Sequence, residues 1–154
     1  MGPNHVLDKG FYIDPASGTV NFGVAAAISG VSQGNVGVLG DTAKVMTTAG
    51  PVAGAVNSPF IGVFQETLDA AKTATGKATA SVRVMGISRA QSDGSAVIAV
   101  GDRVAVSALS TLGQFKTIAA VAGTPFVGIA LSPAAATVGA VFDMLIIPGG
   151  SGQI

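Results

Sequence analysis

Three short segments of this chain occur twice in the same order, and this duplication constrains the fold more than any other feature. The pairs are Gly40–Met46 with Gly101–Val106, Pro59–Val63 with Pro125–Ile129, and Ala80–Ile87 with Ala140–Ile147, at offsets of 61, 66 and 60 residues. A shared order with slightly different offsets is expected for two copies of one unit, because loops tolerate changes in length better than strands do. The segments are short, rich in β-branched residues and bounded by Gly or Pro, so they predict a duplicated β motif.

Short apolar runs separated by Gly, Pro, Asn or Ser predict about eight strands. These are Val20–Ile28, Ala43–Thr48, Phe60–Gln65, Ala78–Ile87, Val97–Val100, Arg103–Ser107, Phe126–Leu131 and Val141–Ile147. Only Glu66–Thr75 has helical spacing, and it is short. We therefore predict an all-β fold. It is a small β-barrel or sandwich built from two pseudo-repeated β units, with an extended N-terminal arm and at most one short helix.

Residues 1–21 differ from the rest because they lack a clean hydrophobic period. We predict an extended arm here, with a turn at Pro15–Gly18 in which Gly18 supplies the positive φ. Its apolar anchors against a sister subunit or another protein would be Val6, Leu7, Phe11, Tyr12 and Ile13. A frayed terminus is the alternative. Residues 22–154 are predicted to form a single β domain, with pseudo-repeats at about 36–90 and 94–148.

The chain is unusually apolar and poor in charge. Apolar residues make up 49% and charged residues 10% of the sequence, whereas about 25% charged residues is typical of a soluble domain. Such a chain must hide more apolar surface than a monomer of this size normally can, so we expect a homo-oligomer. No apolar run reaches the roughly 20 residues of a membrane helix, and we expect no membrane partner. Eight basic residues are scattered among eight acidic ones, which disfavours nucleic acid as a partner.

The residues for catalysis or metal binding are sparse. His5 is the one histidine and cysteine is absent, so a Ser-His-Asp site or a metal-ligand cluster has too few members. The carboxylate pairs Glu66/Asp69 and Asp41/Asp102 are formally possible for glycoside chemistry, but carboxylates near turns and short helices usually cap backbone N–H groups. We therefore expect no enzyme activity, no metal and no cofactor.

Four further residues stand at corresponding places in the two repeats. Gly62 and Gly128 lie inside strands, where glycine indicates a bulge or a close backbone approach. Arg83 and Asp143 carry opposite charge at places that the echoes align. They are candidate interface residues, able to form a salt bridge between the two repeats or across a subunit boundary, although an exposed pair contributes little to stability.

The Gly-Asp turn at 101–102, the Thr124–Leu131 segment and the Val/Ile strand at 141–147 together resemble the small capsid decoration, or cement, proteins of tailed bacteriophages. The resemblance is strongest over residues 94–148 and weaker over 36–90. It implies a β-rich module, made in the host cytoplasm, that trimerises on the outer face of the mature head and bridges major capsid proteins.

The resemblance thus implies a structural virion protein that stabilises the capsid, and it transfers no catalytic residue. The alternative is a carbohydrate- or surface-binding β module of a viral fibre or adhesin. Sugar contacts usually use Trp and Tyr, and Tyr12 is the one such residue here.

Overall fold

The computed structural model describes residues 6–28, 37–38, 41–42, 45–48, 60–107, 113–119 and 126–147. Eleven strands and two short helical segments occur in these ranges. The strands are β1 (Leu7–Ile13), β2 (Ala25–Ile28), β3 (Gly37–Val38), β4 (Asp41–Thr42), β5 (Val45–Thr48), β6 (Phe60–Phe64), β7 (Thr79–Asp93), β8 (Arg103–Val106), β9 (Phe115–Ile118), β10 (Gly128–Ala130) and β11 (Val138–Ile146). The helical segments are η1 (Pro15–Ser17) and α1 (Ala70–Thr73).

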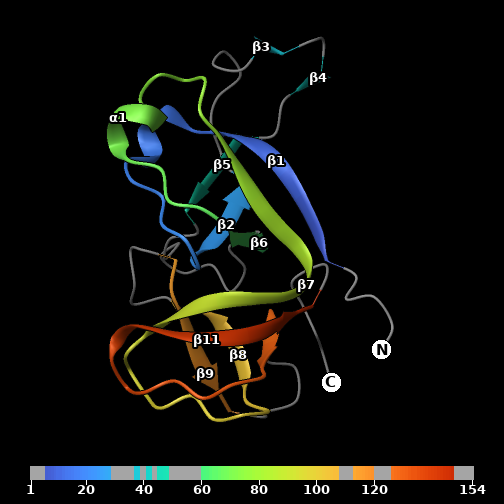
Figure 1. Ribbon diagram of the computed structural model, residues 1–154, viewed down its shortest axis with the longest axis vertical. Coiled ribbons are helices and arrows are strands. Elements are labelled where there is room, and N and C mark those ends of the chain that lie inside the picture. Colours follow the sequence, from blue (N-terminus) through green and yellow to red (C-terminus); the bar gives the residue numbers. More distant parts are fainter. Residues whose placement is uncertain are drawn as a thin grey trace.

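Nine of the strands form one sheet that closes on itself twice. Its order is β1-β5-β2-β6-β7-β11-β10-β8-β9, and the additional pairings β1–β7 and β7–β9 each close a ring of five strands. We call the ring of β1, β5, β2, β6 and the first half of β7 barrel one. Barrel two consists of the second half of β7 with β11, β10, β8 and β9. Figure 1 shows barrel one above barrel two, with β7 crossing between them.

The two barrels have the same strand order and the same strand directions. Around barrel one the order is β7, β1, β5, β2, β6, and around barrel two it is β11, β7, β9, β8, β10. The pairs β1–β5 and β7–β9 are parallel, and every other neighbouring pair in either ring is antiparallel. Barrel two therefore repeats barrel one, strand for strand, in chain order.

Hydrogen bonds fix the residue-by-residue alignment of the copies. The amide of Gly23 donates to the carbonyl of Phe64 at 2.9 Å, and that of Gly101 donates to the carbonyl of Ala130 at 2.8 Å. Both glycines have positive φ, 78° and 89°, a backbone conformation that glycine adopts without strain. Gly101 is therefore the counterpart of Gly23, at an offset of 78 residues.

Hydrogen bonds at another place support this alignment, because in each barrel two residues exchange both of their backbone hydrogen bonds. Val20 and Leu68 form an isolated antiparallel bridge in barrel one, and Ile98 and Ala134 form the corresponding bridge in barrel two. The offsets are again 78 and 66 residues. Val97–Val100, predicted as a strand, contributes only this bridge.

The alignment corrects two pairings drawn from the sequence. The sequence echo pairs Gly40 with Gly101, but in the structure the counterpart of Gly101 is Gly23. Arg83 was matched with Asp143, but the β6–β7 and β10–β11 registers make Leu145 the counterpart of Arg83. Side chains in a strand alternate with a period of two, so a two-residue shift leaves both faces unchanged and the sequence pattern cannot detect it.

Each barrel has its own apolar core, and the two cores lie close together. The core of barrel one contains Ile13, Val20, Val24, Ala26, Phe64, Leu68, Ala80 and Val82. The core of barrel two also includes Ala25, Phe60 and Val63, which come from strands of barrel one. The rings of Phe60 and Phe115 meet edge to face with centroids 6.1 Å apart. The barrels therefore pack directly against each other.

The all-β prediction is confirmed, with a barrel rather than a sandwich. Six predicted strands correspond to β2, β5, β6, β8, β10 and β11, while β7 extends beyond its predicted end to Asp93. Residues 7–13 of the predicted arm are extended but belong to barrel one as β1. The predicted helix shortens to α1, and β9 was not predicted.

The close approach predicted at the two strand glycines is confirmed. A Cβ added to Gly62 would collide with the carbonyl oxygen of Arg83 and lie 2.9 Å from a methyl group of Val82. A Cβ added to Gly128 would lie 2.6 Å from the sulfur of Met144. Val82 and Met144 are themselves counterparts, so both barrels need glycine at this position for the same reason.

Candidate interaction surfaces

Two of the carboxylates that the sequence offered for catalysis bind backbone amides. Glu66 accepts a hydrogen bond from the amide of Ser81 at 2.7 Å. Asp69 is the N-cap of α1 and accepts one from the amide of Lys72 at 2.8 Å. The interpretation as a cap is confirmed for Asp69, whereas Glu66 binds an amide of the strand β7.

Asp102 also has a structural role. Its Oδ2 accepts hydrogen bonds from the amide of Ala99 at 2.8 Å and the hydroxyl of Thr117 at 3.2 Å. His5 and the side chain of Asp41 lie outside the described residues. In the described ranges, no three metal-binding side chains gather in one place. The helices within these ranges are too short to span a bilayer.

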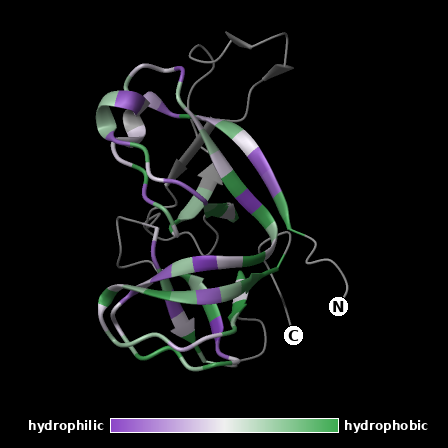
Figure 2. Ribbon diagram, in the orientation of Figure 1, coloured by the Kyte–Doolittle hydropathy of each residue, from purple (hydrophilic) through white to green (hydrophobic). Residues whose placement is uncertain are grey.

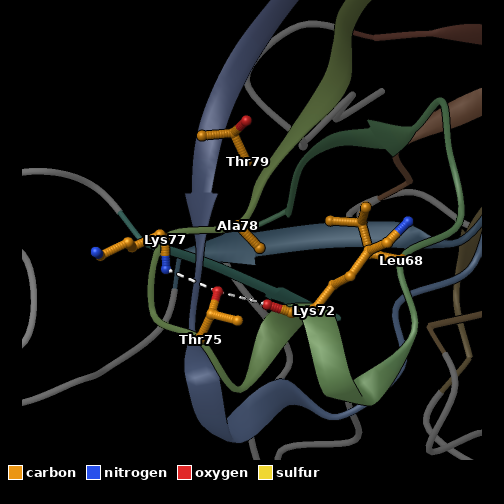
Figure 3. A pocket seen from close by; sticks show the side chains of 6 residues that line it. All are labelled: Leu68, Lys72, Thr75, Lys77, Ala78 and Thr79. Carbon is orange, nitrogen blue, oxygen red and sulfur yellow. Dashed lines mark hydrogen bonds between the residues drawn. The ribbon is translucent and has the colours of Figure 1, made fainter.

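A shallow hollow of about 270 Å³ lies beside α1 (Figure 3). It is lined by Leu68, Lys72, Thr75, Lys77, Ala78 and Thr79. Figure 3 shows the Lys77 side chain extending away from the other lining residues. Within the hollow, Thr75 accepts from the amide of Lys77 at 3.2 Å and donates to the carbonyl of Lys72 at 2.7 Å. Its polar groups thus stabilise the α1 turn.

The predicted arm anchors differ in exposure. Val6 and Leu7 are exposed, Phe11 and Tyr12 are half-buried, and Ile13 is buried in the core of barrel one. The side chain of Ile13 thus stabilises its own barrel. Val6 and Leu7 present apolar surface to solvent, and their role as contacts to another protein stays a prediction.

Arg83 pairs with Asp8 rather than with Asp143 inside the chain. Its Nε and Nη2 donate to the two carboxylate oxygens of Asp8 at 2.7 and 2.9 Å, and its Nη1 donates to the carbonyl of Ile87 at 2.8 Å. The hydrogen bond from Arg83 lowers the pKa of Asp8 below its usual value. Arg83 therefore links Asp8 on β1 to Ile87 on β7, close to where β7 passes from barrel one to barrel two.

Asp93, at the end of β7, is a second perturbed carboxylate. Burial alone would raise its pKa, but hydrogen bonds from Ser107 and Ser95 and the nearby charge of Lys116 lower it on balance. Its Oδ1 accepts from both the amide and the hydroxyl of Ser95, at 2.9 and 2.6 Å. Asp93 thus orders the turn after β7.

A largely apolar surface lies on the outside of barrel two. We call it the barrel-two outer face, and it consists of Ile87, Arg89, Val141, Asp143 and Leu145, all exposed on β7 and β11. Figure 2 shows β11 as a mostly hydrophobic ribbon interrupted by a hydrophilic segment. In register, Ile87 faces Leu145 and Arg89 faces Asp143. The face therefore combines exposed aliphatic side chains with one cation and one anion.

Barrel one is polar at the same positions. The ion pair of Asp8 and Arg83 stands where barrel two has the apolar pair of Ile87 and Leu145, as the strand registers show. These two aliphatic side chains are 40% and 38% exposed. Corresponding positions thus carry charged side chains in barrel one and exposed aliphatic side chains in barrel two.

Two neighbouring positions show the same difference. Val141 is 49% exposed where barrel one has Thr79, and Leu131 is 40% exposed where barrel one has Gln65. Gln65 instead uses its amide to donate to the hydroxyl of Ser88 at 2.9 Å. The apolar character of the barrel-two outer face is therefore not imposed by the fold.

Comparisons with known proteins identify a fold likeness. The chain is similar to the N base of the head fiber protein gp8.5 of bacteriophage phi29, with a TM-score of 0.55 and 14% sequence identity. The likeness covers 97% of this chain and 100% of that one. No family model matches the sequence, and no curated protein matches it. At this identity, the comparison establishes a shared fold.

Proposed function

We propose that this chain is a structural protein of a tailed-phage virion. It attaches to the outer surface of the head as a homo-oligomer, a trimer, and stabilises the head by bridging major capsid proteins. The observation that carries the proposal is the fold likeness to a phage head fiber base over almost the whole chain. The sequence resemblance to capsid decoration proteins points the same way.

The surface of the molecule supports this proposal. Exposed aliphatic residues lie at Val6, Leu7 and Met85 as well as on the barrel-two outer face, and a chain with 10% charged residues has little to keep such surface soluble on its own. Each apolar contact is modest, at about 25 cal/mol per Å² buried. Several contacts per copy, repeated by an oligomer, add to a tight attachment.

The test is co-sedimentation of the purified chain with expanded heads of the same phage that lack it. We expect saturable binding at a fixed number of copies per head and greater resistance of the heads to heat. Heads that neither retain the chain at micromolar concentration nor gain heat resistance would contradict the proposal. Specific signals on a glycan array in that case would favour the carbohydrate-binding alternative.

The contribution of the N-terminal residues needs a point-variant test. Deleting residues 2–14 would remove β1 and open barrel one, so a loss of binding would report unfolding. Replacing Val6 and Leu7 with Ser keeps the strand and removes only exposed apolar surface. We expect weaker attachment to heads or weaker oligomerisation, with Lys9→Ser as the matched control on the same strand.

A further inference from the structure

The barrel-two outer face carries opposite charges in a self-complementary arrangement. Arg89 on β7 and Asp143 on β11 stand directly opposite each other in register. The ion pair formed by described residues is that of Arg83 with Asp8, and neither Arg89 nor Asp143 belongs to it. A cation and an anion are therefore available side by side within an aliphatic surround.

This arrangement fits a second copy of the same chain. When a rotation axis runs along the boundary between β7 and β11, the β11 side of one copy meets the β7 side of the next. Asp143 of each copy then approaches Arg89 of its neighbour, and the aliphatic residues Ile87 and Leu145 gather around the axis. Such repetition closes into a ring when the rotation from one copy to the next is a whole fraction of a turn, as about a threefold axis.

We propose that the barrel-two outer face is the surface through which copies of this chain associate. The inference rests on the homo-oligomer of the proposed function and specifies where its subunits meet. The face consists of outward side chains on two strands that pair with each other from Gly86 with Ile146 to Gln91 with Val141, so the proposed association occurs by packing of these side chains. The contrast with barrel one supports this assignment, since there polar residues take the places of the three aliphatic ones: Asp8 for Ile87, Arg83 for Leu145 and Thr79 for Val141.

The structure provides a matched variant, because barrel one shows which residues this position accepts on an exposed surface. The double variant Ile87→Asp with Leu145→Arg transfers the Asp8–Arg83 ion pair to the equivalent place on barrel two. We expect a folded chain with an unchanged urea midpoint when both proteins are compared as monomers. Its subunit dissociation constant, from sedimentation equilibrium, should rise roughly 100-fold, as for loss of a central apolar contact.

Two further variants separate this surface from a general effect of charge. Thr79→Asp adds a negative charge at the barrel-one counterpart of Val141 and should leave the dissociation constant within about twofold of the original, whereas Val141→Asp should raise it at least tenfold. Arg89→Asp should also weaken association, and the charge reversal Arg89→Asp with Asp143→Arg should restore most of it.

The outcomes distinguish this inference from the proposed function. An oligomer that persists unchanged in the Ile87→Asp/Leu145→Arg and Val141→Asp variants overturns the inference and leaves the virion role standing. A wild-type chain that is monomeric at all concentrations overturns both the inference and the homo-oligomer. Failure of the wild-type oligomer to bind heads overturns the virion role alone.

Discussion

Barrel one and barrel two have the same strand arrangement, but the large core side chain comes from a different strand in each. Barrel one has Phe64 on β6 and Ala80 on β7, whereas barrel two has Ala130 on β10 and Phe142 on β11 at the corresponding positions, and all four are buried. The bridges next to them repeat the exchange, Val20 with Leu68 in one barrel and Ile98 with Ala134 in the other. A large residue on one strand is thus compensated by a small one on its neighbour.

This exchange shows what the duplicated scaffold requires and what it leaves free. Packed cores tolerate redistribution of side chains when total volume and the inward-outward pattern are kept. The close approach at Gly62 and Gly128 cannot be redistributed, because the colliding atoms include backbone. The outer faces, by contrast, can differ in polarity between the barrels. We assign the proposed self-association to the more apolar of the two, the barrel-two outer face.

The core exchange predicts the largest effect on stability. Phe64→Ala should lower the free energy of unfolding by about 4 kcal/mol, since it removes a fully buried ring. Ala80→Phe alone should also destabilise, by about 1–3 kcal/mol, because it overfills a packed core. The double variant reproduces the arrangement of barrel two and should be more stable than Phe64→Ala alone.

Urea unfolding at one fixed protein concentration measures this prediction, because oligomerisation makes stability depend on concentration. Strictly additive losses in the double variant would show that the two cores are not interchangeable. The compensation between Phe64 and Ala80 would then be incorrect, while the alignment of the barrels, which rests on hydrogen bonds and strand registers, would remain.

The strand glycines predict the next largest effect. Gly62→Ala should cost about 3 kcal/mol, because the new Cβ collides with the carbonyl oxygen of Arg83 on the neighbouring strand. Gly128→Ala should cost less, since the flexible side chain of Met144 supplies two of its three closest contacts. Gly10→Ala on β1 is the control, because nothing lies within 4 Å of its added Cβ. Equal midpoints for Gly62→Ala and Gly10→Ala in urea would contradict the close approach.

A smaller effect is expected at α1, which connects β6 to β7 in barrel one. In barrel two, the segment between β10 and β11 forms no helix. Asp69→Ala removes the N-cap hydrogen bond to the amide of Lys72 and should cost about 1 kcal/mol. Asp69→Ser, which also caps helices, should restore most of the loss in thermal unfolding. If Ser does no better than Ala, the cap contributes nothing measurable.

The sequence predicted the elements of this fold better than their alignment. Turn glycines and β-branched runs indicated most strands, and the echo of Phe60–Val63 in Phe126–Ile129 has the offset of 66 that the structure confirms. The third echo is displaced by two residues and the first is matched to a different strand. The displacement of the third echo follows from the period of two in a strand, which hides a two-residue shift, and Ala80 resembles Ala140 although its counterpart is Phe142.

The candidate surface could be predicted only in part. Val6, Leu7 and Asp143 were named from the sequence and are exposed. Ile87 and Leu145 were not named, because aliphatic residues in a strand indicate a core until the register shows which face they occupy. A signal was nonetheless present, since Leu145 and Ile147 flank the inward-facing Ile146 in a run too continuous for a strand with one wet face.

The smallest predicted effect concerns the ion pair that distinguishes the outer face of barrel one. The pKa of Asp8 is lowered in the folded chain, so its contribution is complete above the unfolded pKa of about 4 and is lost as the pH falls through the lower folded value. Because the pair is exposed to solvent, Asp8→Asn should cost only about 0.5 kcal/mol at pH 7.

Because this cost is small at any single pH, the pH dependence of the stability difference is a more decisive measurement than its value at pH 7. As the pH falls below the unfolded pKa of about 4 and through the lower folded value, Asp8 becomes the neutral group that Asn imitates, so the difference in stability between the original chain and Asp8→Asn should shrink. Urea unfolding of both proteins at pH 7 and pH 2.5 tests this, and all other carboxylates cancel in the comparison. A difference that is equal at both pH values would mean that Asp8 acts through its shape and hydrogen bonds alone, and that charge is not what separates this face from its counterpart on barrel two.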